Sequence, residues 1–237
     1  MPTYVTNLVT YIQPTTSTDK PKAIMNPSAK PALLHLDASP RGARSHSRKL
    51  GQDFLTAWRA AHPAGRVVVR DIGREPPPFV TEAWVEGAFA PADQHSPAAR
   101  EAIAVSNRYV DELLAADQLV ITTPIYNLSL PAVLKAWIDQ VVRVGRTFAK
   151  NAAGFEGLAK DKRALVIVAS GSDFRPHTPG GAYNFLEPYL RAVFGFIGIA
   201  DVQFVYAYSL GAGDSTSTQA LAEAQVALTQ LVRPQAA

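Results

Sequence analysis

Three serines and two arginines gather in one short stretch of the sequence, between Asp37 and Ser47. The stretch reads DASPRGARSHS and follows a run of apolar residues. Hydroxyl groups, arginine side chains and the free N–H groups at the start of a helix all attract anions. The functional interpretation is a phosphate-binding loop in which Ser39, Ser45 and Ser47 donate hydrogen bonds to phosphate oxygens. The plainer alternative is a turn in which Ser45 only caps the next helix.

A second candidate segment runs from Thr123 to Ser129 and reads TPIYNLS. Its proline stiffens the chain, and the aromatic ring of Tyr126 and the amide of Asn127 follow directly. These two side chains are suited to lining a flat heterocyclic ligand, with Asn127 hydrogen-bonding to a ring carbonyl or nitrogen. An ordinary turn with an asparagine near a helix cap explains the same residues.

The third candidate segment, residues 169–181, is long, polar and rich in glycine. It exceeds the roughly 2–6 residues of an ordinary strand-to-helix connection, and long loops in compact domains are usually functional or mobile. His177 lies within it and is a candidate for facing a substrate, because a histidine changes charge near neutral pH. The alternative is that His177 is simply exposed.

The elements expected around these segments give them a common location. Short apolar runs predict five parallel strands, and helical periods predict five helices that alternate with them. Such alternation is typical of an α/β fold with a doubly wound parallel sheet and helices on both faces. The strands are expected at 32–36, 66–70, 118–123, 163–169 and 202–206, and the helices at 45–62, 96–115, 129–143, 182–197 and 217–232, with a long irregular connection at 76–94.

Ligands of such sheets bind in the crevice at the carboxyl ends of the strands. The three candidate segments follow the first, third and fourth predicted strands, so all three belong to this edge. The sequence therefore predicts one ligand site built from these loops.

The composition limits what the chain can be. It has 237 residues, of which 47% are hydrophobic and 18% charged, so a sizeable core is expected. Residues 1–30 are rich in Thr, Pro, Ser and Asn and predict a flexible tail, which leaves residues 31–237 as one domain. The absence of cysteine excludes disulfides, cysteine-ligated metals and a thiol nucleophile, and it fits a cytoplasmic protein. The five histidines are scattered, so no metal site is expected.

The charge pattern argues against large charged partners. The net charge is only +3, which gives a weak field around the whole molecule. A cluster of basic residues between 41 and 70 suits a small phosphorylated ligand as well as a nucleic acid. We expect no nucleic-acid partner. We expect no membrane partner either, because the apolar runs fall far short of the roughly 18–20 residues that a membrane-spanning helix needs.

Taken together, the three loops resemble those of a known family. The sequence has Ser-x5-Ser-x-Ser after the first strand, Pro-Ile-Tyr-Asn after the third and a Ser/Gly loop after the fourth. The block PIYNLSLPAVLKAWID, with GRTF shortly after it, is similar to the FMN-dependent NADH azoreductases, which group with the flavodoxin-like NAD(P)H:quinone oxidoreductases. The segments GFEGL, PYL and FGFIGI carry the same likeness, which extends from residue 31 to the C-terminus.

The resemblance implies a flavodoxin-like domain that binds FMN and accepts electrons from NADH or NADPH. It implies two-electron, ping-pong reduction of quinones and azo compounds, with no catalytic side chain because the flavin carries the chemistry. By position, it implies that the cofactor-binding residues are Ser39, Ser45, His46 and Ser47 at the phosphate, Pro124, Ile125, Tyr126, Asn127 and Leu128 along the flavin ring, and Ser170, Gly171, Ser172 and Asp173 near its pyrimidine edge.

The resemblance also implies a substrate pocket near the partner subunit of a homodimer. Phe194 and Phe196 match the region that helps to build this pocket in the family, and Asn127 and His177 are our further candidates for it. The preference between NADH and NADPH stays open, since the sequence does not indicate whether Arg41, Arg44 or Arg175 meets a 2′-phosphate.

One departure from the family concerns the flavin edge. Ser172 and Asp173 stand where the family usually has paired glycines. A carboxylate pointing inward at this place would repel a negatively charged reduced flavin, so we expect a lower redox potential in that case.

The main alternative to an enzyme is a flavodoxin-type one-electron carrier without a substrate of its own. Flavodoxins are typically acidic, whereas this chain is slightly basic. The two alternatives also differ in whether the bound flavin accepts electrons one at a time.

Overall fold

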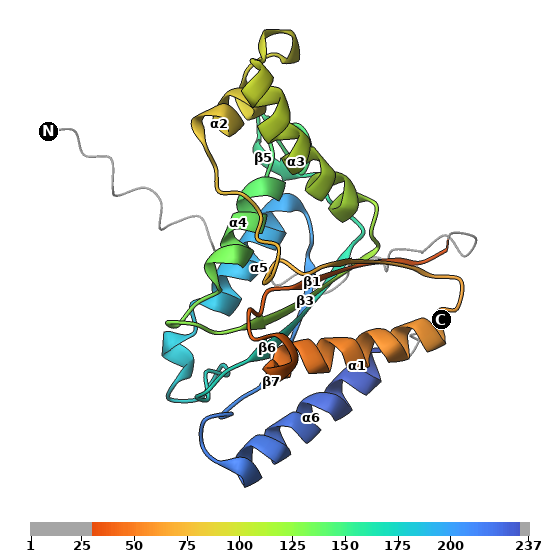
Figure 1. Cartoon of the computed structure of the whole chain (residues 1–237), viewed down its shortest axis with the longest axis vertical. Helices are drawn as coiled ribbons and strands as arrows, with labels where there is room; N and C mark the ends of the chain where they lie inside the picture. The colour runs from red at the N-terminus through yellow and green to blue at the C-terminus, as the bar shows by residue number, and fades with distance from the viewer. Residues whose placement is uncertain (1–29, 233–237) are drawn as a thin grey trace, which may run out of the picture.

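A five-stranded parallel sheet forms the centre of the molecule (Figure 1). The computed structural model describes residues 30–232, so the predicted tail at 1–30 lies outside the described residues except for Lys30. The predicted parallel sheet is confirmed. The strand order reverses direction once, at β1, and in sheets of this kind ligands bind at such a reversal. The order is β2 (Arg66–Arg70), β1 (Ala32–Asp37), β3 (Gln118–Pro124), β6 (Arg163–Ala169) and β7 (Asp201–Ala207).

Helices cover both faces of the sheet, as predicted. Figure 1 shows α1 (His46–Ala61) and α6 (Asp214–Val232) together on one face. The other face is covered by α3 (Pro97–Leu114), α4 (Ala132–Val141) and α5 (Leu186–Ile197).

The two faces of the sheet have separate cores, because successive strand residues point to opposite sides. Leu33 packs in the cluster that contains Phe54 and Trp58 of α1. Leu34 belongs to the cluster on the other face, which contains Trp137 of α4. This alternation explains why the strands read as continuous apolar runs.

The helix beginnings follow from local sequence signals. Ser45 caps α1 by accepting a hydrogen bond from Arg48 N, and Ser96 caps α3 in the same way from Ala99 N. The predicted helices at 129–143 and 182–197 begin later, at Ala132 and Leu186. Pro131 precedes the first of these, and the short 3₁₀ helix η3 (Gly181–Tyr183) precedes the second.

The prediction of a wholly irregular connection at 76–94 was wrong. The segment contains α2 (Glu82–Phe89) and the start of η2 (Ala92–Gln94). Trp84 of α2 is buried and donates its Nε1–H to the side-chain oxygen of Gln140 on α4, at 2.8 Å. This contact between distant residues holds a helix that its own short sequence does not specify.

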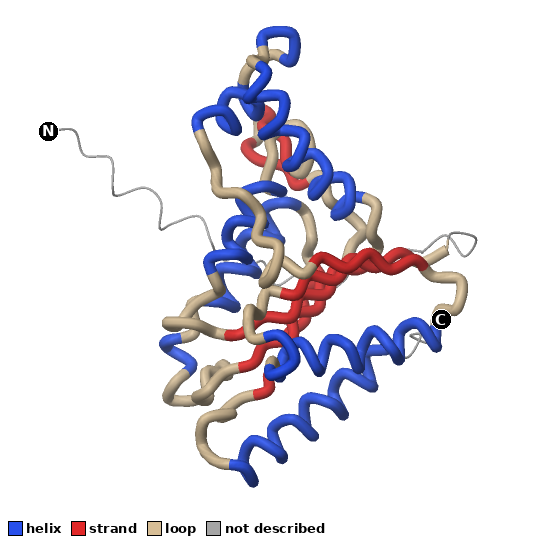
Figure 2. The backbone as a smooth tube through the Cα atoms, viewed as in Figure 1, coloured by secondary structure: helices blue, strands red, loops and turns tan. Residues whose placement is uncertain are grey.

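A two-stranded hairpin was also missed. Strands β4 (Phe148–Asn151) and β5 (Gly154–Gly157) pair antiparallel and lie apart from the main sheet (Figure 2). The backbone of Gly157 passes so close to the end of α5 that a Cβ there would lie 2.2 Å from Gly198 N. The glycine pair therefore lets the hairpin dock on α5.

Candidate functional site

The loop after β1 brings three serine hydroxyls to the beginning of α1. The loop turns through η1 (Gly42–Arg44), where Gly42 adopts a positive φ of 56°. Ser39, Ser45 and Ser47 are all buried, and the Oγ atoms of Ser45 and Ser47 lie 3.2 Å apart. The first turn of a helix has N–H groups without intrahelical acceptors, so this geometry favours an anion.

These serines line a cleft of about 280 Å³ at the carboxyl edge of the sheet. Four strand ends contribute to it, since residues following β1, β3, β6 and β7 all take part. The lining residues are Ser39, Arg41, Ser45, His46, Ser47, Pro124, Ile125, Tyr126, Ala169, Ser170, Gly171, Leu210 and Gly211.

Most of the predicted cofactor residues lie in this cleft, but four do not. Asn127 and Leu128 form an exposed tight turn with positive φ angles of 47° and 73°. Ser172 is exposed and Asp173 is half-buried, and neither lines the cleft. The structure therefore brings the serine loop after β1 together with the first residues of the loops after β3 and β6.

Asp173 is paired with a neighbouring arginine. Its carboxylate accepts hydrogen bonds from Arg175 Nε at 2.9 Å and Arg175 Nη2 at 2.7 Å. These bonds lower the pKa of Asp173. The guanidinium also stacks over the ring of Tyr208, 3.4 Å from its centroid. The condition for a lowered redox potential, an inward carboxylate, is therefore not met here.

The predicted substrate-pocket residues do not come together at the cleft. His177 is exposed, with a positive φ of 70°. Phe196 packs against Phe148 and Phe155 of the hairpin, at centroid distances of 4.7 and 5.4 Å.

The placement of Phe194 in a substrate pocket was wrong. Its side chain is fully buried in the core between α5 and the sheet. It shares the buried face of α5 with Leu186, Leu190 and Ile197. Because of this burial, Phe194 supports the fold and does not meet a ligand.

The loop after β7 was overlooked as part of the site. Leu210 N donates to Ser170 O and Gly211 N donates to Gly171 O, each at 3.0 Å. These bonds fix the loop after β7 beside the loop after β6, so both loops line the cleft. A rule that every carboxyl-end loop of a parallel sheet is a candidate would have included it.

Comparison with known proteins places the chain in a family. A sequence profile described as a flavodoxin-like fold matches residues 31–232. An FMN-dependent NADH:quinone oxidoreductase of Nostoc punctiforme is 51% identical over 200 residues, which cover 84% of this chain and 97% of the relative. The chain belongs to this family of flavodoxin-like oxidoreductases.

Other members of the family agree with this assignment. The FMN-dependent NAD(P)H:quinone oxidoreductase 1 of Pseudomonas aeruginosa is 44% identical over 85% of this chain and 98% of its own. Among solved structures, an azoreductase from Bacillus anthracis superposes with a TM-score of 0.79 at 26% identity, covering 85% of this chain and 98% of that chain. The predicted family resemblance and fold class are thus confirmed.

Within residues 30–232, no group of three or more His, Cys, Asp or Glu side chains is placed to hold a metal ion. In the same part of the chain, no helix combines the length and the apolar character that crossing a membrane requires.

Proposed function

We propose that this protein is an FMN-dependent NAD(P)H:quinone oxidoreductase that also reduces azo compounds, working by a two-electron, ping-pong mechanism. The observation that carries the proposal is the single cleft in which the serine loop at the start of α1 meets the loops after β3, β6 and β7. The names of relatives at 44–51% identity support the same activity. In this proposal, residues 31–237 form one flavin-binding domain.

The residues of the cleft fit the two ends of FMN. Ser39, Ser45, His46 and Ser47 would hold the phosphate, because buried hydroxyls and a helix N-terminus stabilise negative charge without a paired cation. Pro124, Ile125 and Tyr126 would lie along the flavin ring, with Ser170 and Gly171 at its edge. Asn127, Leu128 and Ser172 continue the same loops and would meet only the part of the flavin that extends beyond the cleft.

Bound FMN would supply the two-electron chemistry that links NAD(P)H to a quinone or azo compound at this cleft. The side chains of this protein bind and orient. None of them is assigned as a general acid or base, because solvent can provide the protons. Tyr126 is 39% exposed beside the cleft, so it is available to orient a ring without closing the site.

We also propose a homodimer and a cytoplasmic location. The aromatic cluster of Phe148, Phe155 and Phe196 supports the dimer, because Phe155 is 64% exposed and Phe196 is 37% exposed. Exposed aromatic groups of this size commonly mark an interaction surface. Sedimentation equilibrium of the full chain tests the dimer, and a monomer at micromolar concentration would contradict it.

The experiment that tests the function is an anaerobic absorption titration of the FMN-loaded protein with NADH, followed by a quinone. We expect the flavin absorbance to bleach in one two-electron step and to recover when the quinone is added. Accumulation of a one-electron-reduced species would instead favour the carrier. Absence of FMN binding would contradict both, and would leave the cleft as a structural feature of the fold.

A further inference from the structure

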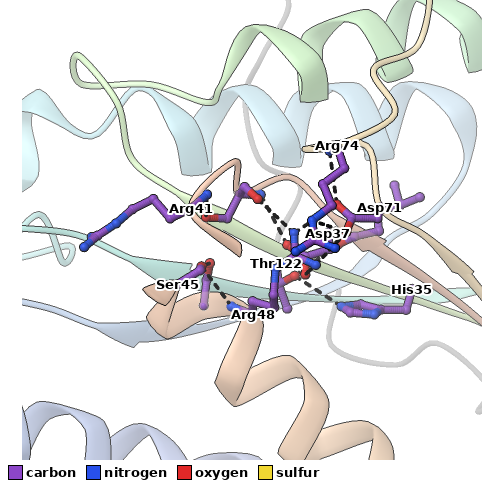
Figure 3. A network of polar contacts seen from close by, with 11 residues as sticks. His35, Asp37, Arg41, Ser45, Arg48, Asp71, Arg74 and Thr122 are labelled. Atoms are coloured by element: carbon purple, nitrogen blue, oxygen red, sulfur yellow. Dashed lines mark hydrogen bonds and ion pairs between the residues drawn. The ribbon is translucent and has the colours of Figure 1, made fainter. Parts of the chain in front are cut away.

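A half-buried arginine lies directly behind the phosphate loop and does not line the cleft. Arg48 lies in the first turn of α1, beside Asp37 and Asp71 (Figure 3). Its side chain is only 12% exposed. Its two terminal nitrogens donate to both carboxylate oxygens of Asp71, at 2.6 and 2.9 Å. Nη1 also lies 3.0 Å from the carboxylate of Asp37. One guanidinium therefore bridges the end of β1 and the end of β2.

This bridge holds the backbone of Ser39, a residue of the cleft. Arg48 Nη2 donates to Ser39 O at 2.9 Å, and Ser39 N donates to Asp37 Oδ1 at 3.2 Å. Both polar groups of the Ser39 backbone are thus fixed by the ion-pair network. The hydroxyl of Ser39 accepts a hydrogen bond from Arg41 N at 3.4 Å, and its own proton remains available to a ligand in the cleft.

The segment after β2 also contacts the backbone of Ser39, through Gly73. Gly73 N donates to Asp37 O at 2.9 Å. A Cβ built on Gly73 would lie 2.5 Å from Ser39 O and 2.6 Å from Ser39 C. Because no side chain fits between them, the backbones of the two loops are in direct contact.

The charges of the network matter for an anionic ligand. Asp37 is almost fully buried, and burial raises the pKa of its carboxyl. The hydrogen bonds from Arg48 lower the pKa of Asp71. Without Arg48, up to two negative charges would lie behind a loop that must attract a phosphate, and the buried one would be left unpaired. With both carboxylates as partners, Arg48 is not free to bind a phosphate itself.

We propose that Arg48 is a positioning residue for phosphate binding. It fixes Ser39 through Asp37 and Asp71 and neutralises their charge, without touching the cofactor. Asp71 and Gly73 thereby become part of the site, although they follow a strand whose loop does not line the cleft. This inference rests on the proposed function, because the ligand that it considers is the phosphate of FMN.

The test compares FMN with riboflavin, which has the same ring but no phosphate. Dissociation constants for both are measured on the full-length apoprotein by flavin fluorescence, in wild type, Arg48→Gln and Asp71→Asn. We expect the affinity for FMN to fall at least about tenfold in Arg48→Gln, the loss of roughly one charge-assisted hydrogen bond. It should fall by less in Asp71→Asn, which removes one anchor of Arg48 but also a negative charge behind the loop. Riboflavin binding should change little in either variant. A general folding defect would weaken both ligands equally, so the ratio of the two constants isolates the phosphate.

A matched control is available one residue away from the network. Arg70 makes a similar two-pronged ion pair with Glu112, but neither residue contacts Ser39 or the cleft. Arg70→Gln should leave the FMN-to-riboflavin ratio at its wild-type value. A change as large as that of Arg48→Gln would overturn the proposal, because any lost surface ion pair would then have the same effect.

The remaining outcomes separate the inference from the function. If wild type binds neither flavin, the proposed function fails. If wild type prefers FMN and folded Arg48→Gln keeps the same preference, only the inference fails. Should Arg48→Gln not fold, Asp71→Asn decides, since Asp71 is 25% exposed and its loss leaves the Arg48–Asp37 pair in place.

Discussion

Nε2 of His35 on β1 lies 3.2 Å from the hydroxyl oxygen of Thr122 on β3. That hydroxyl donates its own proton to Leu36 O at 3.3 Å, so it accepts one from His35. The histidine therefore carries a proton on Nε2, and its Nδ1 is buried without a hydrogen-bond partner in the described chain. Burial, assisted by the positive charge of Arg48, lowers the pKa of His35 to about 4.

This relationship predicts a loss of stability in mild acid. Between pH 6.5 and about pH 4, the unfolded chain binds a proton on this histidine that the folded chain excludes. Stability from this source is complete above pH 6.5 and is lost as the pH falls. We expect a loss of about 2 kcal/mol between pH 7 and pH 5, measured by urea unfolding.

The matched variant for this experiment is His35→Gln, which keeps a donor for Thr122 but does not titrate. It should lose less stability than wild type over the same pH range. Equal losses in the two proteins would show that other groups govern the acid sensitivity.

The serine loop predicts a specific loss of cofactor binding. Ser45→Ala combined with Ser47→Ala should raise the dissociation constant of FMN at least about tenfold, because a hydrogen bond to a charged group contributes roughly 1.5–3 kcal/mol. Ser45 also caps α1, so stability should fall by about 1 kcal/mol.

Ser96→Ala separates these two effects. Ser96 caps α3 away from the cleft, so its loss should lower stability without changing FMN affinity. Unchanged FMN affinity in the double serine variant would refute the assignment of the phosphate loop.

At Gly51, helix α1 packs closely against strands β1 and β3 of the sheet. A Cβ at this position would lie 2.3 Å from Thr122 Cγ2 and 3.1 Å from His35 Nε2. We expect Gly51→Ala to lower the free energy of unfolding by about 1–3 kcal/mol, as overpacking does in other cores. Gly195 is also within a helix but has nothing within 4 Å of its Cβ position, so Gly195→Ala should raise stability by about 0.5–1 kcal/mol. Thermal unfolding of both variants checks the opposite signs.

The pairing of Asp173 with Arg175 leads us to expect little influence of this carboxylate on the midpoint potential of bound FMN. Its charge is compensated by Arg175 and lies outside the cleft, so Asp173→Asn should shift the midpoint potential of bound FMN by less than about 20 mV, the equivalent of a weak surface ion pair. Reductive titration against a reference dye measures this shift. A clearly more positive potential in the variant would mean that the carboxylate turns toward the flavin when the cofactor is bound.

Sequence reasoning worked where a signal is local. The strands are continuous apolar runs, and the serine loop follows the first of them, so both could be read from neighbouring residues. The error at Phe194 was avoidable, because the buried residues Leu186, Leu190, Phe194 and Ile197 follow helical spacing. Phe196 falls off that face and is exposed.

Other features depend on contacts between residues far apart in the sequence, so no short stretch of the sequence indicates them. Helix α2 is held by a hydrogen bond between Trp84 and Gln140, which are 56 positions apart. The pairing of Arg48 with Asp71 spans 23 positions, and either residue alone resembles an ordinary surface charge. Such pairs become visible only when the strand order brings their segments together.

The contribution of Leu210 and Gly211 has a consequence for the newly made chain. These residues follow β7, the final strand of the described sheet, so translation must pass Gly211 before the cleft is complete. A nascent chain on the ribosome that ends before β7 lacks one wall of the site and its hydrogen bonds to Ser170 and Gly171. The complete cleft is thus available to a flavin only after synthesis has passed Gly211.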